Sequence, residues 1–226
     1  MRSFDYIESG KTLLTPHTTS LLAAIHEAKG RQSIQTTIRP DILGTLVAVA
    51  RIQSTDASNR IEGISTSDSR LNDLVSEKVT PRNRNEEEIA GYRDALSVIH
   101  ESHDYIPITP NVILQLHRDL FRHTPLTFAG HFKDSDNVII ERDAHGTSTV
   151  RFAPPSALVT PELIERACSA YTQAIRDGHT DPLLAIAMFI LDFICIHPFN
   201  DGNGRMSRLL TLLMLYRNGY MVGKYI

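Results

Sequence analysis

Apolar residues recur at intervals of three and four along most of the chain, which is the spacing of one face of an α-helix. Prolines stand at the start of several of these stretches and glycines at the end of others. The pattern predicts helices over about 16–30, 40–62, 85–102, 110–121, 161–176, 182–196 and 204–217. Gly30 and Gly63 are expected to end the first two of them. The fold class is therefore predicted to be all-α.

One stretch has β-strand character instead. Residues 137–141 (NVIIE) and 149–152 (TVRF) favour strands, and turn-forming residues lie between them. They predict one small β-hairpin, which must lie against the helical body because an isolated hairpin is barely stable. Residues 65–84 are polar and predict a surface loop or a short helix. The acidic run Glu86, Glu87 and Glu88 predicts a solvated first turn of the helix that follows it.

Composition and charge narrow the class of protein. With 23 Lys and Arg against 26 Asp and Glu, the chain is too close to neutral to coat nucleic acid by charge alone. Its most apolar stretch, 183–196, is shorter than the roughly 18–20 residues of a membrane span and predicts a buried helix. The two cysteines, Cys168 and Cys195, lie in apolar surroundings and do not suggest a disulfide scaffold. We therefore expect a cytoplasmic protein, with no membrane and no nucleic acid as partner.

The most informative segment is the polar run from His197 to Arg208, which joins two apolar helices. Gly202 and Gly204 permit backbone conformations that other residues resist, and they expose N–H groups where a helix begins. Such a helix N-terminus favours a bound phosphate. Arg205 and Arg208 add forked donors that suit phosphate oxygens.

Two further side chains in this segment have chemistry of their own. Asp201 is a hard oxygen ligand, which suits a Mg²⁺ ion that keeps several waters and bridges phosphates. His197 titrates near neutral pH, so it can take a proton from an attacking hydroxyl. A base, a metal carboxylate, an anion site and two arginines in one short segment predict phosphoryl or nucleotidyl transfer.

Residues 197–208 read His-x-Phe-x-Asp-Gly-Asn-Gly-Arg-x-x-Arg, which resembles the signature of the Fic family at every defined position. Fic proteins are helical enzymes, and most transfer AMP from ATP to a protein hydroxyl with release of pyrophosphate. Doc-type toxins depart from the Gly-Asn-Gly-Arg part, which is intact here and favours AMP transfer. The resemblance implies ATP as substrate, His197 as catalytic base, Asp201 on Mg²⁺, and phosphate contacts from Gly202, Asn203, Gly204, Arg205 and Arg208.

The predicted hairpin resembles the flap of Fic proteins. Phe152-Ala153-Pro154-Pro155 is similar to the flap's exit, and residues 127–133 are similar to its entry. The resemblance implies that a target protein adds a strand to residues of about 131–152, which brings its hydroxyl near the base.

Residues 58–63, Ser-Asn-Arg-Ile-Glu-Gly, resemble the inhibitory helix motif of the family, with Ser58, Glu62 and Gly63 at its defined positions. The resemblance implies that Glu62 pairs with Arg208 and competes with the γ-phosphate. The motif alone also fits a helix end, although a carboxylate at the negative end of a helix calls for a cationic partner. The implied organisation is an N-terminal helical region, 1–84, with an inhibitory helix near 55–63, and a catalytic core, 85–226.

Several alternatives stay open from the sequence. The same groups suit a hydrolase that removes AMP from a modified protein, and they suit a nucleotide-binding regulatory module. A second copy of the chain, in a homo-oligomer, remains an alternative partner. Apolar residues at 220–226 lead us to expect further helices beyond the end of the chain. His117 shares an apolar helix face and is expected to be a core histidine.

Overall fold

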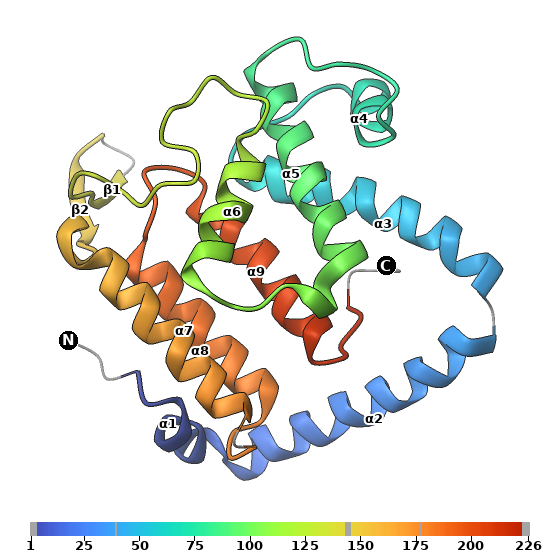
Figure 1. Ribbon diagram of the computed structural model, residues 1–226, viewed down its shortest axis with the longest axis vertical. Coiled ribbons are helices and arrows are strands. Elements are labelled where there is room, and N and C mark those ends of the chain that lie inside the picture. The colour runs from blue at the N-terminus through green and yellow to red at the C-terminus, as the bar shows by residue number, and fades with distance from the viewer. Residues whose placement is uncertain (1–3, 39, 143–145, 177, 223–226) are drawn as a thin grey trace.

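The computed structural model describes residues 4–38, 40–142, 146–176 and 178–222, with the side chains of 33–38, 40–43 and 142 excepted. That part of the chain is mainly helical and has one two-stranded antiparallel sheet (Figure 1). The helices are α1 (Tyr6–Leu13), α2 (Pro16–Ile38), α3 (Pro40–Ile61), α4 (Asp68–Val75), α5 (Arg84–Ser102), α6 (Pro110–Leu120), α7 (Thr160–Arg176), α8 (Pro182–Ile196) and α9 (Asn203–Arg217), with single 3₁₀ turns at His103–Tyr105 and Ala157–Val159.

The pattern of apolar residues predicted most of these elements, with ends within a residue or two. The predicted end of α2 at Gly30 is wrong, because the helix continues to Ile38. A glycine inside a helix costs only about 1 kcal/mol relative to alanine, so it does not by itself stop one. The prediction for 65–84 is confirmed by the short helix α4. Helix α1 was not predicted; the Asp5 side chain caps it by accepting the Glu8 N–H, and Tyr6 is buried.

The core lies between α5, α6, α7, α8 and α9, with α9 running through the middle of the bundle (Figure 1). Phe189 and Phe193 of α8 and Tyr216 of α9 are almost fully buried in it. Helices α5 and α6 approach each other so closely that a Cβ on Gly91 would collide with the Leu120 carbonyl. This packing holds the end of α8 and the start of α9 in one place, and the connection between them carries the predicted chemistry.

The N-terminal helices pack on different parts of this core, with α1 against α7 and α8. Helix α3 packs on α4 and α5, and its C-terminal end reaches α9. Gly63 ends α3 as predicted, with φ of 75°. The Gly63 N–H donates to the Arg60 carbonyl and the Ile64 N–H donates to the Asn59 carbonyl. This pair of bonds is a Schellman motif, and it fixes where Glu62 leaves the helix.

The predicted hairpin is present as β1 (Ile139–Arg142) and β2 (Ser148–Phe152), which lie at one end of the α7–α8 pair (Figure 1). Ile140 pairs with Val150, and a register irregularity lies between Ile139 and Ile140. All five residues of β2 are exposed. The predicted turn residues 143–145 lie outside the described residues.

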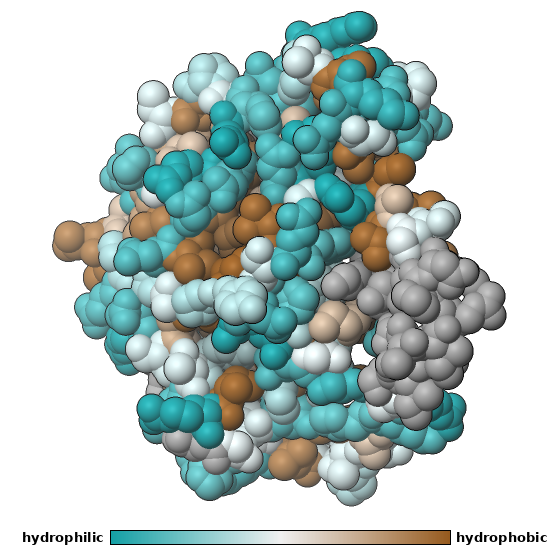
Figure 2. Space-filling model, turned by 45° about the vertical axis from the view of Figure 1, so that its right-hand side comes forward, coloured by the Kyte–Doolittle hydropathy of each residue, from teal (hydrophilic) through white to brown (hydrophobic). Residues whose placement is uncertain are grey.

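The view in Figure 2 shows a mainly hydrophilic face that hydrophobic patches interrupt. Within the described residues, no helix combines the length and the hydropathy that a bilayer span requires. Cys168 is buried and Cys195 is half-buried, and both are free thiols.

Candidate active site

The predicted base lies at the end of a buried helix. His197 follows α8 and adopts a left-handed conformation, with φ of 50° and ψ of 64°, while its N–H donates to the Phe193 carbonyl at 3.0 Å. Positive φ is uncommon for residues other than glycine, so the surrounding structure must hold it. Burial lowers the pKa of the His197 imidazole, and the positive charge of Lys133 lowers it further. Both effects favour the neutral ring, which is the form that accepts a proton.

Asn203 shapes the loop that follows. Its side chain is buried, its Oδ1 accepts the Phe199 N–H at 3.0 Å, and its Nδ2 donates to the Phe199 carbonyl at 2.8 Å. Gly202 has φ of 81°, and a Cβ there would come within 2.8 Å of the Phe121 ring. The amide group of Asn203 is thus occupied, so a phosphate contact from this residue would come from its backbone N–H at the start of α9.

His117 supports the same loop from α6. The Gly130 N–H donates to its Nδ1 at 2.9 Å, and its Nε2 lies 3.1 Å from the Asp201 carbonyl, so the ring is neutral with the proton on Nε2. It stacks on Phe199 with ring centroids 3.7 Å apart. Burial lowers its pKa to about 4. The prediction of a core histidine is confirmed, and this buried ring supports the loop between α8 and α9.

The Asp201 carboxylate lies in the loop between α8 and α9 and is half-exposed. Its Oδ1 accepts the Gly202 N–H at 2.5 Å, and its Oδ2 lies 3.8 Å from Arg84 Nη2. One open carboxylate beside backbone N–H groups fits Mg²⁺, which is usually held by one or two carboxylates together with substrate phosphates. No group of three or more acidic, His or Cys side chains gathers as a metal site among the described residues.

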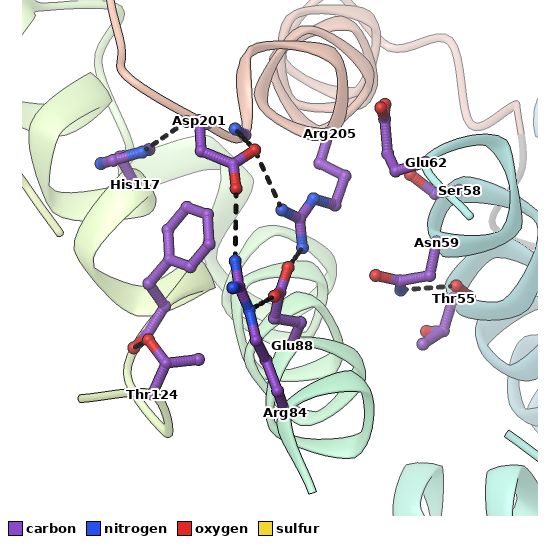
Figure 3. Close-up of polar contacts among 12 residues, drawn as sticks. Thr55, Ser58, Asn59, Glu62, Arg84, Glu88, His117, Thr124, Asp201 and Arg205 are labelled. Atoms are coloured by element: carbon purple, nitrogen blue, oxygen red, sulfur yellow. Dashed lines mark hydrogen bonds and ion pairs between the residues drawn. The ribbon is translucent and has the colours of Figure 1, made fainter. Parts of the chain in front are cut away.

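Arg205 is 1% exposed and points away from solvent, toward α5 (Figure 3). Its Nη1 lies 2.7 Å from Glu88 Oε2 as an ion pair, and its Nη2 lies 3.7 Å from Asp201 Oδ1. Arg84 donates to the other oxygen of Glu88 at 2.8 Å. Figure 3 shows these four side chains as one connected network.

The prediction that the first turn of α5 is solvated is wrong for two of its three glutamates. Glu88 is 4% exposed against Arg205, and Glu86 is 4% exposed against Arg70, at 2.5 Å. Hydrogen bonding from Arg70 lowers the pKa of Glu86 to about 2. The arginines come from α4 and α9, so the local sequence does not reveal these partners.

Arg208, one turn further along α9, faces α3. Its Nε donates to Ser58 Oγ at 2.7 Å, and its Nη2 donates to the Ser58 carbonyl at 3.0 Å and to Glu62 Oε1 at 2.6 Å. A Cβ on Gly204 would collide with the same Glu62 oxygen. The Glu62 carboxylate therefore lies directly on the first turn of α9, and the predicted contact between Glu62 and Arg208 is present.

The structure thus brings His197, Asp201, Arg205, Arg208 and Glu62 to one end of α9. The sequence interpretation missed Lys133, Arg84 and Glu88. For Glu88 a signal existed, because it stands four residues before Tyr92 on the core face of α5 and so had to be buried with a partner. Lys133 carried no such signal, since its loop has no helical or strand period.

Comparison with known proteins agrees with this geometry. Residues 107–215 match the Fic/DOC family. A Fido domain-containing protein of Dictyostelium discoideum is 37% identical over 90 residues, which are 38% of this chain and 58% of the relative. Protein adenylyltransferase fic-1 of Caenorhabditis elegans is 28% identical over 145 residues, 61% of this chain and 25% of the relative. The chain thus spans only part of the length of either relative.

Solved structures share the fold. A Fic domain-containing signaling protein from Bacteroides thetaiotaomicron superposes with a TM-score of 0.73 at 24% identity, covering 88% of this chain and 73% of that one. Fic-1 of Caenorhabditis elegans superposes with a TM-score of 0.68 at 22% identity, covering 91% and 60%. At these identities the likeness concerns the fold alone.

Proposed function

We propose, from the match of residues 107–215 to the Fic/DOC family, that this protein is a nucleotidyltransferase that moves AMP from ATP to a hydroxyl of a protein side chain. The observation that carries the proposal is the joint between α8 and α9. It places a half-buried histidine with a lowered pKa and a helix N-terminus that has no side-chain cap hydrogen bond within one short loop. The relatives named protein adenylyltransferase support the same reaction class.

The reaction follows from the roles of the residues. His197 takes the proton of the acceptor hydroxyl, whose oxygen attacks the α-phosphorus of ATP. The bond from the α-phosphorus to the oxygen that bridges to the β-phosphate breaks, and pyrophosphate leaves. Backbone N–H groups of 203 and 204 offer donors to the phosphate oxygens as negative charge develops there, which is where fixed donors lower the barrier most. Arg208 supplies a forked donor for the terminal phosphates.

Asp201 would hold Mg²⁺, which neutralises phosphate charge when it is bound. Arg205 differs from Arg208 because Glu88 already neutralises it in the interior. We therefore assign it a fixed position behind Asp201, where it contributes charge and holds the carboxylate in place.

Glu62 restrains this site as an inhibitory residue within the same proposal. It occupies an Arg208 donor and lies on Gly204, where the γ-phosphate would need both the arginine and the space. A carboxylate there also repels a phosphate. The protein would then bind ATP productively only after Glu62 moves aside.

The hairpin is the proposed platform for the target protein. Its described residues are largely exposed, including the apolar side chains of Val138, Ile140 and Val150. An exposed strand edge can pair with an extended segment of another chain by main-chain hydrogen bonds. The flap would then present the target's hydroxyl from the side of the loop that carries His197.

The test is transfer of label from α-labelled ATP with Mg²⁺ to this protein or to lysate proteins. His197→Ala should lose at least about 10²-fold of the labelling rate, the usual contribution of a general base. His179→Ala removes an exposed histidine and serves as the matched control. Unchanged labelling in His197→Ala would reject the proposed base.

Further measurements distinguish AMP transfer from the other functions that the same residues could serve. Label from γ-labelled ATP would indicate a kinase, and loss of AMP from a pre-labelled target would indicate a hydrolase. ATP binding without transfer to any acceptor would favour the nucleotide-binding regulatory module.

A further inference from the structure

Lys133 is a buried lysine beside the proposed base, and the proposed mechanism does not use it. Its side chain is 3% exposed, in the segment that leads from α6 into the hairpin. Its Nζ donates to the Ile196 carbonyl at 3.2 Å, and its backbone N–H donates to the Pro198 carbonyl at 2.8 Å. One residue therefore binds the carbonyl before His197 and the carbonyl after it.

The remaining contacts of this ammonium are also with uncharged groups. Nζ donates to Asn137 Oδ1 at 3.1 Å, and Asn137 Nδ2 donates to the Phe199 carbonyl at 3.4 Å. No ion pair joins Lys133 to a carboxylate among the described residues, although Asp136 is near enough to favour its charge. Burial lowers the pKa of Lys133, as expected for a cation removed from water.

A buried cation with neutral partners is costly to a fold, so its location is informative. Here it stands at the C-terminal, negative end of α8, where a positive charge is stabilised by the helix dipole. The same charge acts on the neighbouring imidazole and disfavours its protonation. That imidazole belongs to His197, which follows α8 and has a left-handed backbone conformation with φ of 50°.

We propose that Lys133 is a positioning residue for His197, holding the carbonyls of Ile196 and Pro198 on either side of it and placing a positive charge beside its ring. Because 131–137 continues directly into β1, the same contacts fix the flap relative to the base. The distance between an acceptor hydroxyl on the flap and His197 would then depend on Lys133. This inference rests on the proposed function only in taking His197 as the base.

The experiment measures the pKa of the His197 imidazole and, separately, the rate of AMP transfer. The imidazole pKa is followed by NMR in protein with labelled histidine, with His197→Ala used to assign the signal. Lys133→Gln keeps a donor of similar reach and removes the charge. It should raise the His197 pKa by roughly half a unit to one unit. The acid limb of the rate-against-pH profile should move by the same amount.

Kinetics separate positioning from general loss of structure. Lys133→Met removes donor and charge and should lower kcat by roughly 10- to 100-fold, the scale of a small misplacement of reacting groups. KM for ATP should stay the same, because Lys133 does not reach the phosphate site. Asn137→Ala keeps the charge, so it should lower kcat without moving the His197 pKa. Lys78→Met, at an exposed lysine, is the matched control.

An unchanged His197 pKa in folded Lys133→Gln would overturn the proposal, as would a rise in KM for ATP with kcat intact. If Lys133→Met does not fold, the His197 pKa and kcat of Lys133→Gln and Asn137→Ala are sufficient to test the positioning role. The NMR result does not depend on turnover. A protein with no AMP transfer but a shifted His197 pKa would therefore refute the proposed function and leave the effect of the Lys133 charge on His197 established.

Discussion

Replacing Glu62 by glycine should raise the rate of AMP transfer, and the size of the increase can be estimated from the contact of Glu62 with Arg208. Glu62 Oε1 and Arg208 Nη2 are 2.6 Å apart, with the two side chains 36% and 30% exposed. A fully exposed pair of this kind contributes roughly 0.2–1 kcal/mol, and burial of about two thirds of each side chain places this one at or above the upper end. Couplings between sites are typically about 1–3 kcal/mol, which corresponds to about 5- to 150-fold.

Charge repulsion between the Glu62 carboxylate and the γ-phosphate gives a second estimate of how strongly Glu62 opposes ATP binding. Two like charges about 4 Å apart cost about 4 kcal/mol at an effective dielectric constant of 20. A γ-phosphate on Arg208 would meet the Glu62 carboxylate at comparable range, so the two cannot share the arginine. We therefore expect Glu62→Gly to raise the initial rate of labelling at least about fivefold, mainly through productive binding of ATP.

The assay compares initial rates of transfer from α-labelled ATP over a range of ATP concentrations. Glu62→Gln removes only the charge and should give part of the increase. Glu101→Gly, at an exposed glutamate in the last turn of α5, controls for the loss of helix propensity. Arg208→Ala should not activate, and adding it to Glu62→Gly should abolish the gain, since in the proposed function the same guanidinium serves inhibition and ATP binding. No gain in Glu62→Gly, with ATP binding unchanged, would refute the inhibitory role.

Three other predictions follow from the same geometry. Asp201→Ala should weaken Mg²⁺-dependent nucleotide binding, and an identical Mg²⁺ titration of activity would assign Asp201 another role. His117 has a folded pKa of about 4, below its ordinary value of 6.5. The stability that the neutral His117 ring contributes to the fold is therefore fully present above about pH 6.5. As the pH falls toward 4, the free energy of unfolding decreases by about 3 kcal/mol. Urea unfolding of wild type and His117→Gln between pH 4 and 8 checks this slope. Gly91→Ala should destabilise the fold by about 1–3 kcal/mol in thermal melts, because its Cβ would meet the Leu120 backbone.

The sequence predicted the fold well where a segment's own pattern decides its structure. Helices α8 and α9 have apolar faces, a starting proline or glycine and a polar joint between them, so their limits could be stated within about a residue. Gly63 ended α3 because the residues around it complete a local hydrogen-bond motif. Gly30 misled us because a glycine lowers helix stability without forbidding the helix.

By reasoning from the residues alone, the site was predictable only as far as its residues are close together in the chain. The distant pair of Glu62 and Arg208 was predicted from the family resemblance. His197, Asp201 and the arginines lie on one segment, so their chemistry could be read together. The arginine partners of Glu86 and Glu88 could not be read this way, because each arginine comes from another helix. Lys133 likewise becomes informative only when the fold places it across two peptide groups of a distant turn.

Arg205 and Arg208 of α9 each form an ion pair with a carboxylate, and the two pairs differ in burial. Arg205 and Glu88 are 1% and 4% exposed, so separating them would leave a charge in the interior at a cost of about 3–5 kcal/mol. Glu62 and Arg208 are about one third exposed, so water can solvate either partner when they separate. A nucleotide can therefore displace Glu62 far more easily than Glu88. We expect regulation to act through the α3 carboxylate, with the α5 carboxylate acting as part of the scaffold.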